Sequence, residues 1–320
     1  MKILANDGLS TSGITALKDA GFEFIEQKVA QDQLARFINE YQVEILLVRS
    51  TTKVPQILID ICTGLKLIGR GGVGLDNIDV AYARKKGVEV INTPEASSHS
   101  VAELVFSHLF GMARFLHETN REMPLQGDQN FKTLKKNYSK GIELKGKTLG
   151  VIGAGRIGKA VMKIALGTGM DLKVFDQTPD DHTVTLNFFD GQEVSFKIPI
   201  VSKEEVLKKS DFITLHVPKQ DHPILSEREF AVMKRGVGII NTSRGGLVNE
   251  SNLLKALNTG QVAYAGLDVF ENEPTPSMKV LMHPQLSLSP HIGGSTQEAQ
   301  DQIGIELAQQ IIRRFPHPTR

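Results

Sequence analysis

Three side chains that together can handle a proton and a carboxylate follow apolar, strand-like runs in the second half of the chain. They are Arg244, Glu273 and His291. An arginine can hold a carboxylate through two parallel hydrogen bonds, and a histidine beside a carboxylate is oriented by it and exchanges protons near neutral pH. The strands of a parallel sheet present their carboxyl ends at one edge, so we expect these residues to converge. Their chemistry would be proton transfer to and from a hydroxy acid that is held by its carboxylate.

The members of this set are weaker signals than the set itself. His291 is one of nine histidines, and an arginine after a strand is as often part of a surface ion pair. Glu271 lies two residues before Glu273, and spacing alone does not choose between them. The prediction depends on all three members following strands of one sheet.

A glycine pattern suggests the second reactant. Gly153, Gly155 and Gly158 have the spacing G-x-G-x-x-G between an apolar run from Thr148 and a helix-compatible run from Arg156. The first glycine permits a tight turn, the second lets the backbone approach a pyrophosphate, and the third lets the helix pack near the strand. A glycine turn without a ligand is the simpler interpretation, but the strand–turn–helix context argues against it. Free N–H groups at the helix start favour phosphate.

An acidic residue follows at the position where a dinucleotide would need one. The next apolar run, 172–175, leads directly into Asp176. A carboxylate about 20 residues past the glycines bonds the adenosine ribose hydroxyls and repels a 2′-phosphate. The sequence therefore predicts NAD rather than NADP as the cofactor, and hydride transfer as the reaction class.

The elements that must position these residues alternate between strand and helix. Strands are expected at 3–6, 22–25, 44–49, 65–69, 88–92, 212–217, 238–242, 264–269 and 286–289, and early helices near 11–20, 31–41, 54–62 and 77–86. This alternation predicts an α/β fold with two parallel-sheet domains. We expect a Rossmann NAD-binding domain, residues 99–292, inserted in a flavodoxin-like substrate-binding domain made of residues 1–98 and 293–320.

Two helices have capping boxes at their predicted starts. Ser100 and Glu103 open a long helix whose wide apolar stripe suggests a subunit or domain interface. Ser295 and Glu298 open the final helix, which should run to about Arg314.

Two further segments stand apart from the alternation. The polar, lysine-rich segment 124–147 is interpreted as a solvated loop. Two β-rich runs flank Asp190-Gly191, which predicts an inserted hairpin with a type I′ turn.

Composition restricts the class of protein. The 320 residues are 40% hydrophobic and 23% charged, with a formal net charge of +1, so neither nucleic acid nor a membrane surface is an expected partner. No apolar run reaches the ~20 residues of a membrane span, and the N-terminus reads as a strand rather than a signal peptide. The single cysteine, Cys62, fits core packing in a cytoplasmic protein. No metal site is singled out.

Several segments in combination carry a family resemblance. They are 69–79, 92–94, the glycine loop, 216–218, 241–246, 267–274 and 290–296. With these segments the chain resembles the D-isomer-specific 2-hydroxyacid dehydrogenases over nearly its whole length, and within them the phosphoglycerate dehydrogenase branch. The resemblance implies NAD-dependent oxidation of 3-phospho-D-glycerate to 3-phosphooxypyruvate, the first step of serine biosynthesis.

The resemblance also implies roles for individual residues. His291 would be the general acid/base paired with Glu273, and Arg244 would hold the substrate carboxyl end. The cofactor-binding set would comprise Gly153, Gly155, Arg156, Ile157, Gly158, Asp176, His216, Val217, Pro218, Thr242, Asp268, His291 and Gly293. Arg156 and Ile157 would lie over the pyrophosphate, 216–218 near the adenine and its ribose, and Asp268 on the nicotinamide side.

The remaining substrate contacts follow from the same resemblance. The backbone amides of Val73 and Gly74 would take the carboxylate, while Arg49 and Arg70 would lie near the phosphate. Lys136 would reach a neighbouring subunit's site, and a homodimer would form through the helix that starts near Ser100.

The chain also departs from the family pattern. The asparagine that many relatives carry near 95–98 is missing, and the hairpin over 183–198 is longer than usual. The chain stops after the final helix, so we expect neither a C-terminal regulatory domain nor feedback inhibition by serine.

Two alternatives stay open. The same chemistry could act on lactate, glycerate or glyoxylate. The cations near Arg49 argue against these substrates, because none of them carries a phosphate. A corepressor that responds to NAD is the alternative from another class, and the complete Arg–Glu–His set argues against it.

Overall fold

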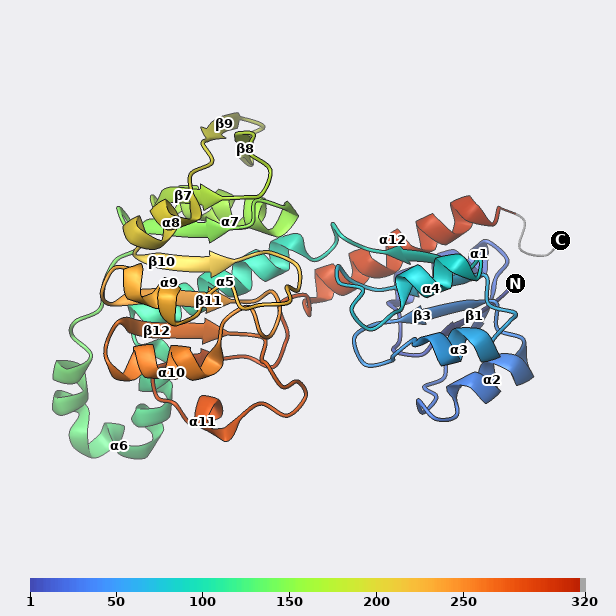
Figure 1. The fold of residues 1–320 in the computed structure, drawn as a ribbon, viewed down its shortest axis with the longest axis horizontal. Helices are drawn as coiled ribbons and strands as arrows, with labels where there is room; N and C mark the ends of the chain where they lie inside the picture. Colours follow the sequence, from blue (N-terminus) through green and yellow to red (C-terminus); the bar gives the residue numbers. More distant parts are fainter. Residues whose placement is uncertain (317–320) are drawn as a thin grey trace. The chain divides into compact units, whose positions relative to one another are not determined.

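The computed structural model describes residues 1–316, which form two compact units (Figure 1). One unit contains Met1–Ser98 and the chain from Gly294 onward, and the other is His99–Gly293. The second boundary lies one residue later than predicted. Within residues 1–316, no helix is both long enough and apolar enough to cross a membrane.

The first unit is built on a five-stranded parallel sheet in the order β2-β1-β3-β4-β5. Its strands are β1 (Lys2–Ala5), β2 (Glu23–Ile25), β3 (Ile45–Val48), β4 (Leu67–Arg70) and β5 (Glu89–Asn92). Leucine and isoleucine side chains bring α1 (Thr11–Asp19) and α12 (Gln297–Arg314) onto one face. The other face carries α2 (Leu34–Tyr41), α3 (Gln56–Ile61) and α4 (Val80–Lys85). This is the flavodoxin-like order.

The second unit has a six-stranded parallel sheet in the order β13-β12-β11-β10-β6-β7. Its strands are β6 (Thr148–Ile152), β7 (Asp171–Phe175), β10 (Phe212–Leu215), β11 (Val237–Asn241), β12 (Val262–Leu267) and β13 (Leu286–Leu288). A single parallel bridge between Val174 and Ile200 extends the sheet beyond β7. The strand order therefore reverses between β6 and β10, as in a Rossmann sheet.

Helices cover both faces of this second sheet (Figure 1). The apolar sides of α5 (Ser98–Ala113) and α7 (Arg156–Gly167) pack on one face. The other face is covered by α8 (Lys203–Lys209), α9 (Glu227–Val232) and α10 (Glu250–Asn258), and α11 (Met278–Leu281) precedes β13. The predicted α/β class with two parallel sheets is confirmed.

Both predicted capping boxes are wrong in position. α5 begins at Ser98, so Ser100 lies inside the first turn, and the Ser98 hydroxyl donates to the carbonyl of Pro94. α12 is capped by Thr296, whose hydroxyl oxygen accepts from the N–H of Ala299. Each start lies in a run of adjacent Ser, Thr or His residues, and the sequence pattern cannot choose among neighbouring hydroxyls.

The predicted loop over 124–147 is wrong in its first half. Residues Leu116–Asn137 form α6, which contains Pro124 and has non-helical backbone angles at Asn130. Only Leu134 of this helix is buried. Its polar composition thus reflects an exposed helix rather than a loop.

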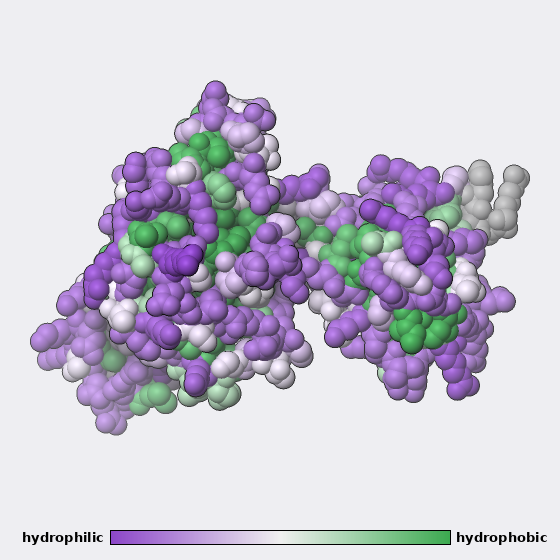
Figure 2. Space-filling model, in the orientation of Figure 1, coloured by the Kyte–Doolittle hydropathy of each residue, from purple (hydrophilic) through white to green (hydrophobic). Residues whose placement is uncertain are grey.

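The inserted hairpin is present, with a different turn. β8 (His182–Asn187) and β9 (Glu193–Ile198) pair antiparallel. Gly191 alone has positive φ, at 85°, and its N–H donates to the carbonyl of Phe188. Because a type I′ turn needs positive φ at both central residues, this is a three-residue loop with a type I turn followed by a left-handed glycine. The tip exposes Phe188 and Phe189, and Figure 2 shows hydrophobic surface on this hairpin.

Candidate active site

The structure brings His291 and Glu273 into direct contact. His291 Nδ1 lies 2.8 Å from Glu273 Oε2, while Glu273 Oε1 accepts the N–H of Phe270 at 2.9 Å. Because a carboxylate only accepts, Nδ1 carries the proton of this bond. His291 Nε2 is left as the atom that can take up a proton from a ligand. The residue itself has a φ of 55°, a left-handed conformation that is uncommon outside glycine and concentrates at functional sites.

Glu271 is engaged elsewhere. Its Oε1 accepts the N–H of Glu250 at the start of α10, and Glu250 Oε1 accepts the N–H of Glu271 at 2.7 Å. Burial raises the pKa of Glu250, the N–H of Glu271 opposes this shift, and the Glu271 charge adds to it. This reciprocal pair ties the segment after β12 to α10, and it leaves Glu273 as the carboxylate beside His291.

A buried carboxylate holds the loop that carries His291. Asp268, at the end of β12, has no exposed surface. Its Oδ1 accepts from the Ser289 hydroxyl at 2.6 Å and from the N–H of Ile292 at 2.9 Å. Its Oδ2 accepts the N–H of Gly293 at 2.8 Å. Asp268 and Gly293, both predicted as cofactor contacts, therefore anchor the loop on either side of His291.

Arg244 follows β11, the strand next to β12. Its Nη1 donates to the carbonyl of Ser243 at 2.6 Å. A Cβ on the following residue, Gly245, would lie 1.8 Å from the carbonyl oxygen of Phe270. Only glycine permits this approach, which brings the Arg244 loop against the segment that leads to Glu273.

The glycine loop contacts the turn after β10. Gly153 has a φ of 102°, and a Cβ there would lie 2.4 Å from the His216 carbonyl oxygen and 2.8 Å from Val217. The His216 N–H donates to Ile152 at 2.8 Å. Burial lowers the pKa of His216 to about 3, so its ring is neutral. Pro218 is exposed beside it.

Asp176 lies at the end of β7 and bonds the same glycine loop. Its Oδ2 accepts the N–H of Ala154 at 2.6 Å, and its Oδ1 accepts the N–H of Thr178. Burial acts to raise the pKa of Asp176, but the N–H groups of Thr178 and Ala154 more than offset it, so the pKa lies below its ordinary value. The carboxylate is ionised at neutral pH and lies beside the glycines.

Three features leave room for a ligand around this loop. An added Cβ on Gly155 would meet nothing within 4 Å. Gly155 caps α7 without any side-chain hydrogen bond, and Arg156 behind it is exposed while Ile157 is half-buried. The Thr242 hydroxyl is buried with no hydrogen-bond partner in the part of the chain that the structure describes.

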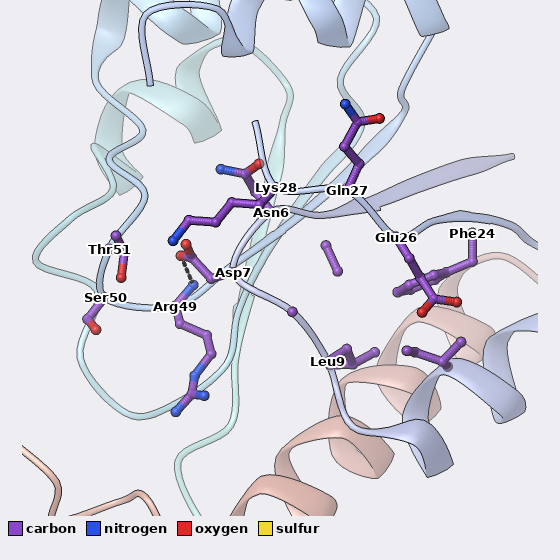
Figure 3. A pocket seen from close by; sticks show the side chains of 13 residues that line it. Asn6, Asp7, Leu9, Phe24, Glu26, Gln27, Lys28, Arg49, Ser50 and Thr51 are labelled. Carbon is purple, nitrogen blue, oxygen red and sulfur yellow. Dashed lines mark hydrogen bonds between the residues drawn. The ribbon is translucent and has the colours of Figure 1, made fainter. Parts of the chain in front are cut away.

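In the first unit, the loop after β3 borders a cavity of about 530 Å³ (Figure 3). Asp7 accepts from the N–H groups of Arg49 and Thr52 and from the Thr52 hydroxyl. Burial lowers the pKa of Arg49, which the Asp7 charge opposes. Among residues 1–316, the Arg49 guanidinium donates no hydrogen bond and forms no ion pair.

The other predicted substrate residues are not among those that line this cavity. Arg70, at the end of β4, folds back over Gly72 and donates to the Gly71 carbonyl at 3.2 Å. The amides of Val73 and Gly74 donate to no group among the described residues. Lys136 is exposed near the end of α6. It has no contact with Arg49, Arg244 or His291 among those described above.

Comparison with known proteins identifies the family. The model of the D-isomer specific 2-hydroxyacid dehydrogenase, NAD binding domain matches residues 106–293. The chain belongs to the D-isomer specific 2-hydroxyacid dehydrogenases. The matched segment lies within the second unit and contains the glycine loop, Arg244, Glu273 and His291.

Three relatives of this family illustrate the range of similarity. A D-3-phosphoglycerate dehydrogenase from Bacillus subtilis (strain 168) is 37% identical over 98% of this chain and 56% of its own length. A hydroxypyruvate reductase from Thermotoga maritima is 38% identical over 98% of both chains. A glyoxylate reductase from Paecilomyes thermophila superposes with a TM-score of 0.80 at 27% identity, covering 98% of this chain and 95% of that one. The chain spans little more than half the length of phosphoglycerate dehydrogenases that it matches, with coverages from 53% to 57%.

The predicted cofactor, NAD, is confirmed by the family match. The residues present also fit a dinucleotide. The open space at Gly155 suits a pyrophosphate, the Asp176 carboxylate suits ribose hydroxyls, and the orphaned Thr242 hydroxyl offers a polar contact.

Two glycine substitutions separate ligand space from protein packing. Gly155→Ala should leave stability nearly unchanged, because the new methyl meets no protein atom, yet weaken NADH binding about tenfold or more. Gly158→Ala should cost about 1–3 kcal/mol of stability, since its methyl would lie 2.1 Å from the Gly153 carbonyl oxygen. Fluorescence titration and thermal melting measure the two effects. Equal NADH affinity in Gly155→Ala and the wild type would contradict a pyrophosphate at this loop.

One cation is missing from the residues selected by sequence. Lys28 lines the same cavity as Arg49 and extends toward Asp7 (Figure 3). It lies in the loop after β2, in no motif and after no long apolar run, so the sequence offered no signal for it.

Proposed function

We propose that the chain catalyses the NAD-dependent oxidation of 3-phospho-D-glycerate to 3-phosphooxypyruvate, the first step of serine biosynthesis. The observation that carries the reaction class is the His291–Glu273 pair, which leaves His291 Nε2 available. In this proposal Arg244 holds the substrate carboxylate, and Nε2 takes the proton of the substrate hydroxyl as the carbonyl forms. Glu273 stabilises the resulting imidazolium. Bound NAD supplies the hydride acceptor.

The charges around the first unit's cavity support a phosphorylated substrate. Two acids line it, but Asp7 is engaged with the Arg49–Thr52 loop and Glu26 pairs with Lys18 at 2.9 Å. Arg49 and Lys28 form no ion pair among the described residues. Two such cations on the wall of one cavity suit a phosphate dianion.

Arg49→Gln tests the phosphate contact. For 3-phospho-D-glycerate, kcat/KM should fall roughly 30- to 100-fold, because a charge-assisted contact of about 2–3 kcal/mol is lost. For D-glycerate, which lacks the phosphate, kcat/KM should change less than about threefold. NADH absorbance or fluorescence follows both reactions. Equal losses for the two substrates would count against a phosphate at Arg49.

Hydroxypyruvate reduction is a second candidate. It is favoured by the Thermotoga maritima relative, which matches over 98% of both chains. A panel of 2-hydroxy and 2-keto acids separates the two. Turnover of hydroxypyruvate without turnover of 3-phospho-D-glycerate would select the second candidate, with His291, Glu273 and Arg244 in unchanged roles.

We also propose a cytoplasmic homodimer that contacts through α5 and α6. Large apolar side chains are exposed along these helices: Phe110, Leu116, Met123, Leu125 and Phe131. A run of exposed apolar side chains of this size is typical of an interface. Lys136 lies on the same helix as four of them, which supports its proposed role toward a neighbouring subunit. The single cysteine fits a reducing compartment.

A further inference from the structure

A buried histidine lies behind the candidate active site. His108, in the middle of α5, is 5% exposed. Its Nδ1 lies 2.8 Å from the Ser287 hydroxyl, and its Nε2 lies 3.1 Å from the Ser289 hydroxyl. Both serines belong to β13 or the residue that follows it. The ring therefore joins α5 to the strand that leads into His291.

The hydrogen-bond directions follow from the chemistry of Asp268. Its carboxylate accepts the N–H groups of Ile292 and Gly293, so the single hydroxyl proton of Ser289 points to Asp268 Oδ1. Ser289 Oγ must then accept from His108 Nε2–H. Burial lowers the pKa of His108, which the Asp268 charge opposes and His117 reinforces, and the ring is neutral. His108 Nδ1 is consequently the acceptor for the Ser287 hydroxyl.

Packing alone does not explain a histidine at this position. The neighbouring buried side chains of α5 are apolar, among them Val105, Leu109 and Met112. The facing strand provides the space, because a Cβ on Gly266 would lie 2.8 Å from His108 Cβ. Burying an imidazole costs desolvation free energy that an apolar residue would not cost. An imidazole with both nitrogens hydrogen-bonded also orients its partners, which an apolar residue cannot do.

We propose that His108 is a positioning residue for His291. It orients the Ser289 hydroxyl, which with the N–H groups of Ile292 and Gly293 fixes Asp268 and the loop that carries His291. The role rests on the proposed function, in which His291 exchanges the substrate proton. His108 itself contacts no substrate or cofactor in this role.

Two pairs of variants isolate the bond to Ser289. His108→Asn places an amide near Nδ1, so it keeps a partner for Ser287 and loses the one for Ser289, whereas His108→Gln reaches the Nε2 position. Ser289→Ala breaks the chain to Asp268, and Ser287→Ala breaks only the other bond of the ring. We expect His108→Asn and Ser289→Ala to lower kcat roughly tenfold with little change in substrate KM. We expect His108→Gln to stay within about threefold and Ser287→Ala within about twofold of the wild type.

Melting temperatures separate positioning from folding. If all four variants melt at a lower temperature than the wild type but keep its kcat, His108 is only a core residue and the proposal is wrong. Equal kcat losses in Ser287→Ala and Ser289→Ala would also overturn it, because the bond to Ser287 does not reach Asp268.

A spectroscopic measurement is independent of turnover. In the full chain labelled with ¹⁵N-histidine, His108 should show the neutral Nε2–H tautomer. The His291 ring signals should shift or broaden in His108→Asn and Ser289→Ala but not in Ser287→Ala. Unmoved His291 signals in every variant would overturn the proposal. A wild-type chain that is inactive on every 2-hydroxy and 2-keto acid would refute the proposed function instead, and the ¹⁵N result would still decide the role of His108.

Discussion

Replacing His291 with alanine should lower kcat about 10²- to 10⁴-fold while NADH still binds. The variant loses the ring that pairs with Glu273, and with it the atom that would accept the substrate proton. The proposed cofactor contacts around the glycine loop come from other strands, so NADH affinity should change little. Steady-state kinetics and fluorescence titration measure the two quantities.

Two controls make this result specific. His283→Ala removes a histidine of the same unit whose ring makes two long contacts, to Asn258 Oδ1 and to the N–H of Gln285, both at 3.4 Å, and it should keep full activity. Glu273→Gln should lower kcat, whereas Glu271→Gln should act on stability through the α10 contact. Normal turnover of His291→Ala would refute the assigned acid–base role.

Replacing Asp268 with alanine should destabilise the second unit by about 3–5 kcal/mol. The substitution leaves the Ile292 and Gly293 N–H groups and the Ser289 hydroxyl without their buried acceptor, and each unsatisfied donor costs about 1–3 kcal/mol before partial relaxation. Urea unfolding followed by circular dichroism measures the loss.

The matched control is an exposed aspartate of the same unit. Asp180→Ala should change stability by less than about 0.5 kcal/mol. A loss below about 1 kcal/mol in Asp268→Ala would mean that water or a neighbouring group replaces the carboxylate, and the described anchoring of the His291 loop would then be unnecessary.

Much of the fold could be predicted because its signals are local. Alternating strands and helices, the glycine spacing and the acid at the end of the next strand each depend on residues close together in the chain. The helix α6 could not be predicted in the same way. Only Leu134 of α6 is buried, so the helix lacks the apolar stripe on which a sequence-based prediction depends.

The sequence pattern also could not determine the type of the hairpin turn or the first residue of two helices. Asp190-Gly191 is compatible with a type I′ turn and with the three-residue loop that forms, since both need glycine at the same place. At Ser295 the signal was one residue early, because the neighbouring Thr296 hydroxyl caps α12. At Ser100 the predicted start lies inside α5, which begins at Ser98.

By itself, the sequence determined which residue types follow which strands: an arginine after β11, acids after β12 and a histidine after β13. The family resemblance implied that Glu273 pairs with His291. Only the tertiary structure showed this contact, the bond between Glu271 and the first residue of α10, and the histidine in α5 that bonds the strand leading to His291. The physical reason is that neighbouring carboxylates look alike in sequence. Their roles depend on donors that lie elsewhere in the chain and reach them only after the sheet and its helices have packed.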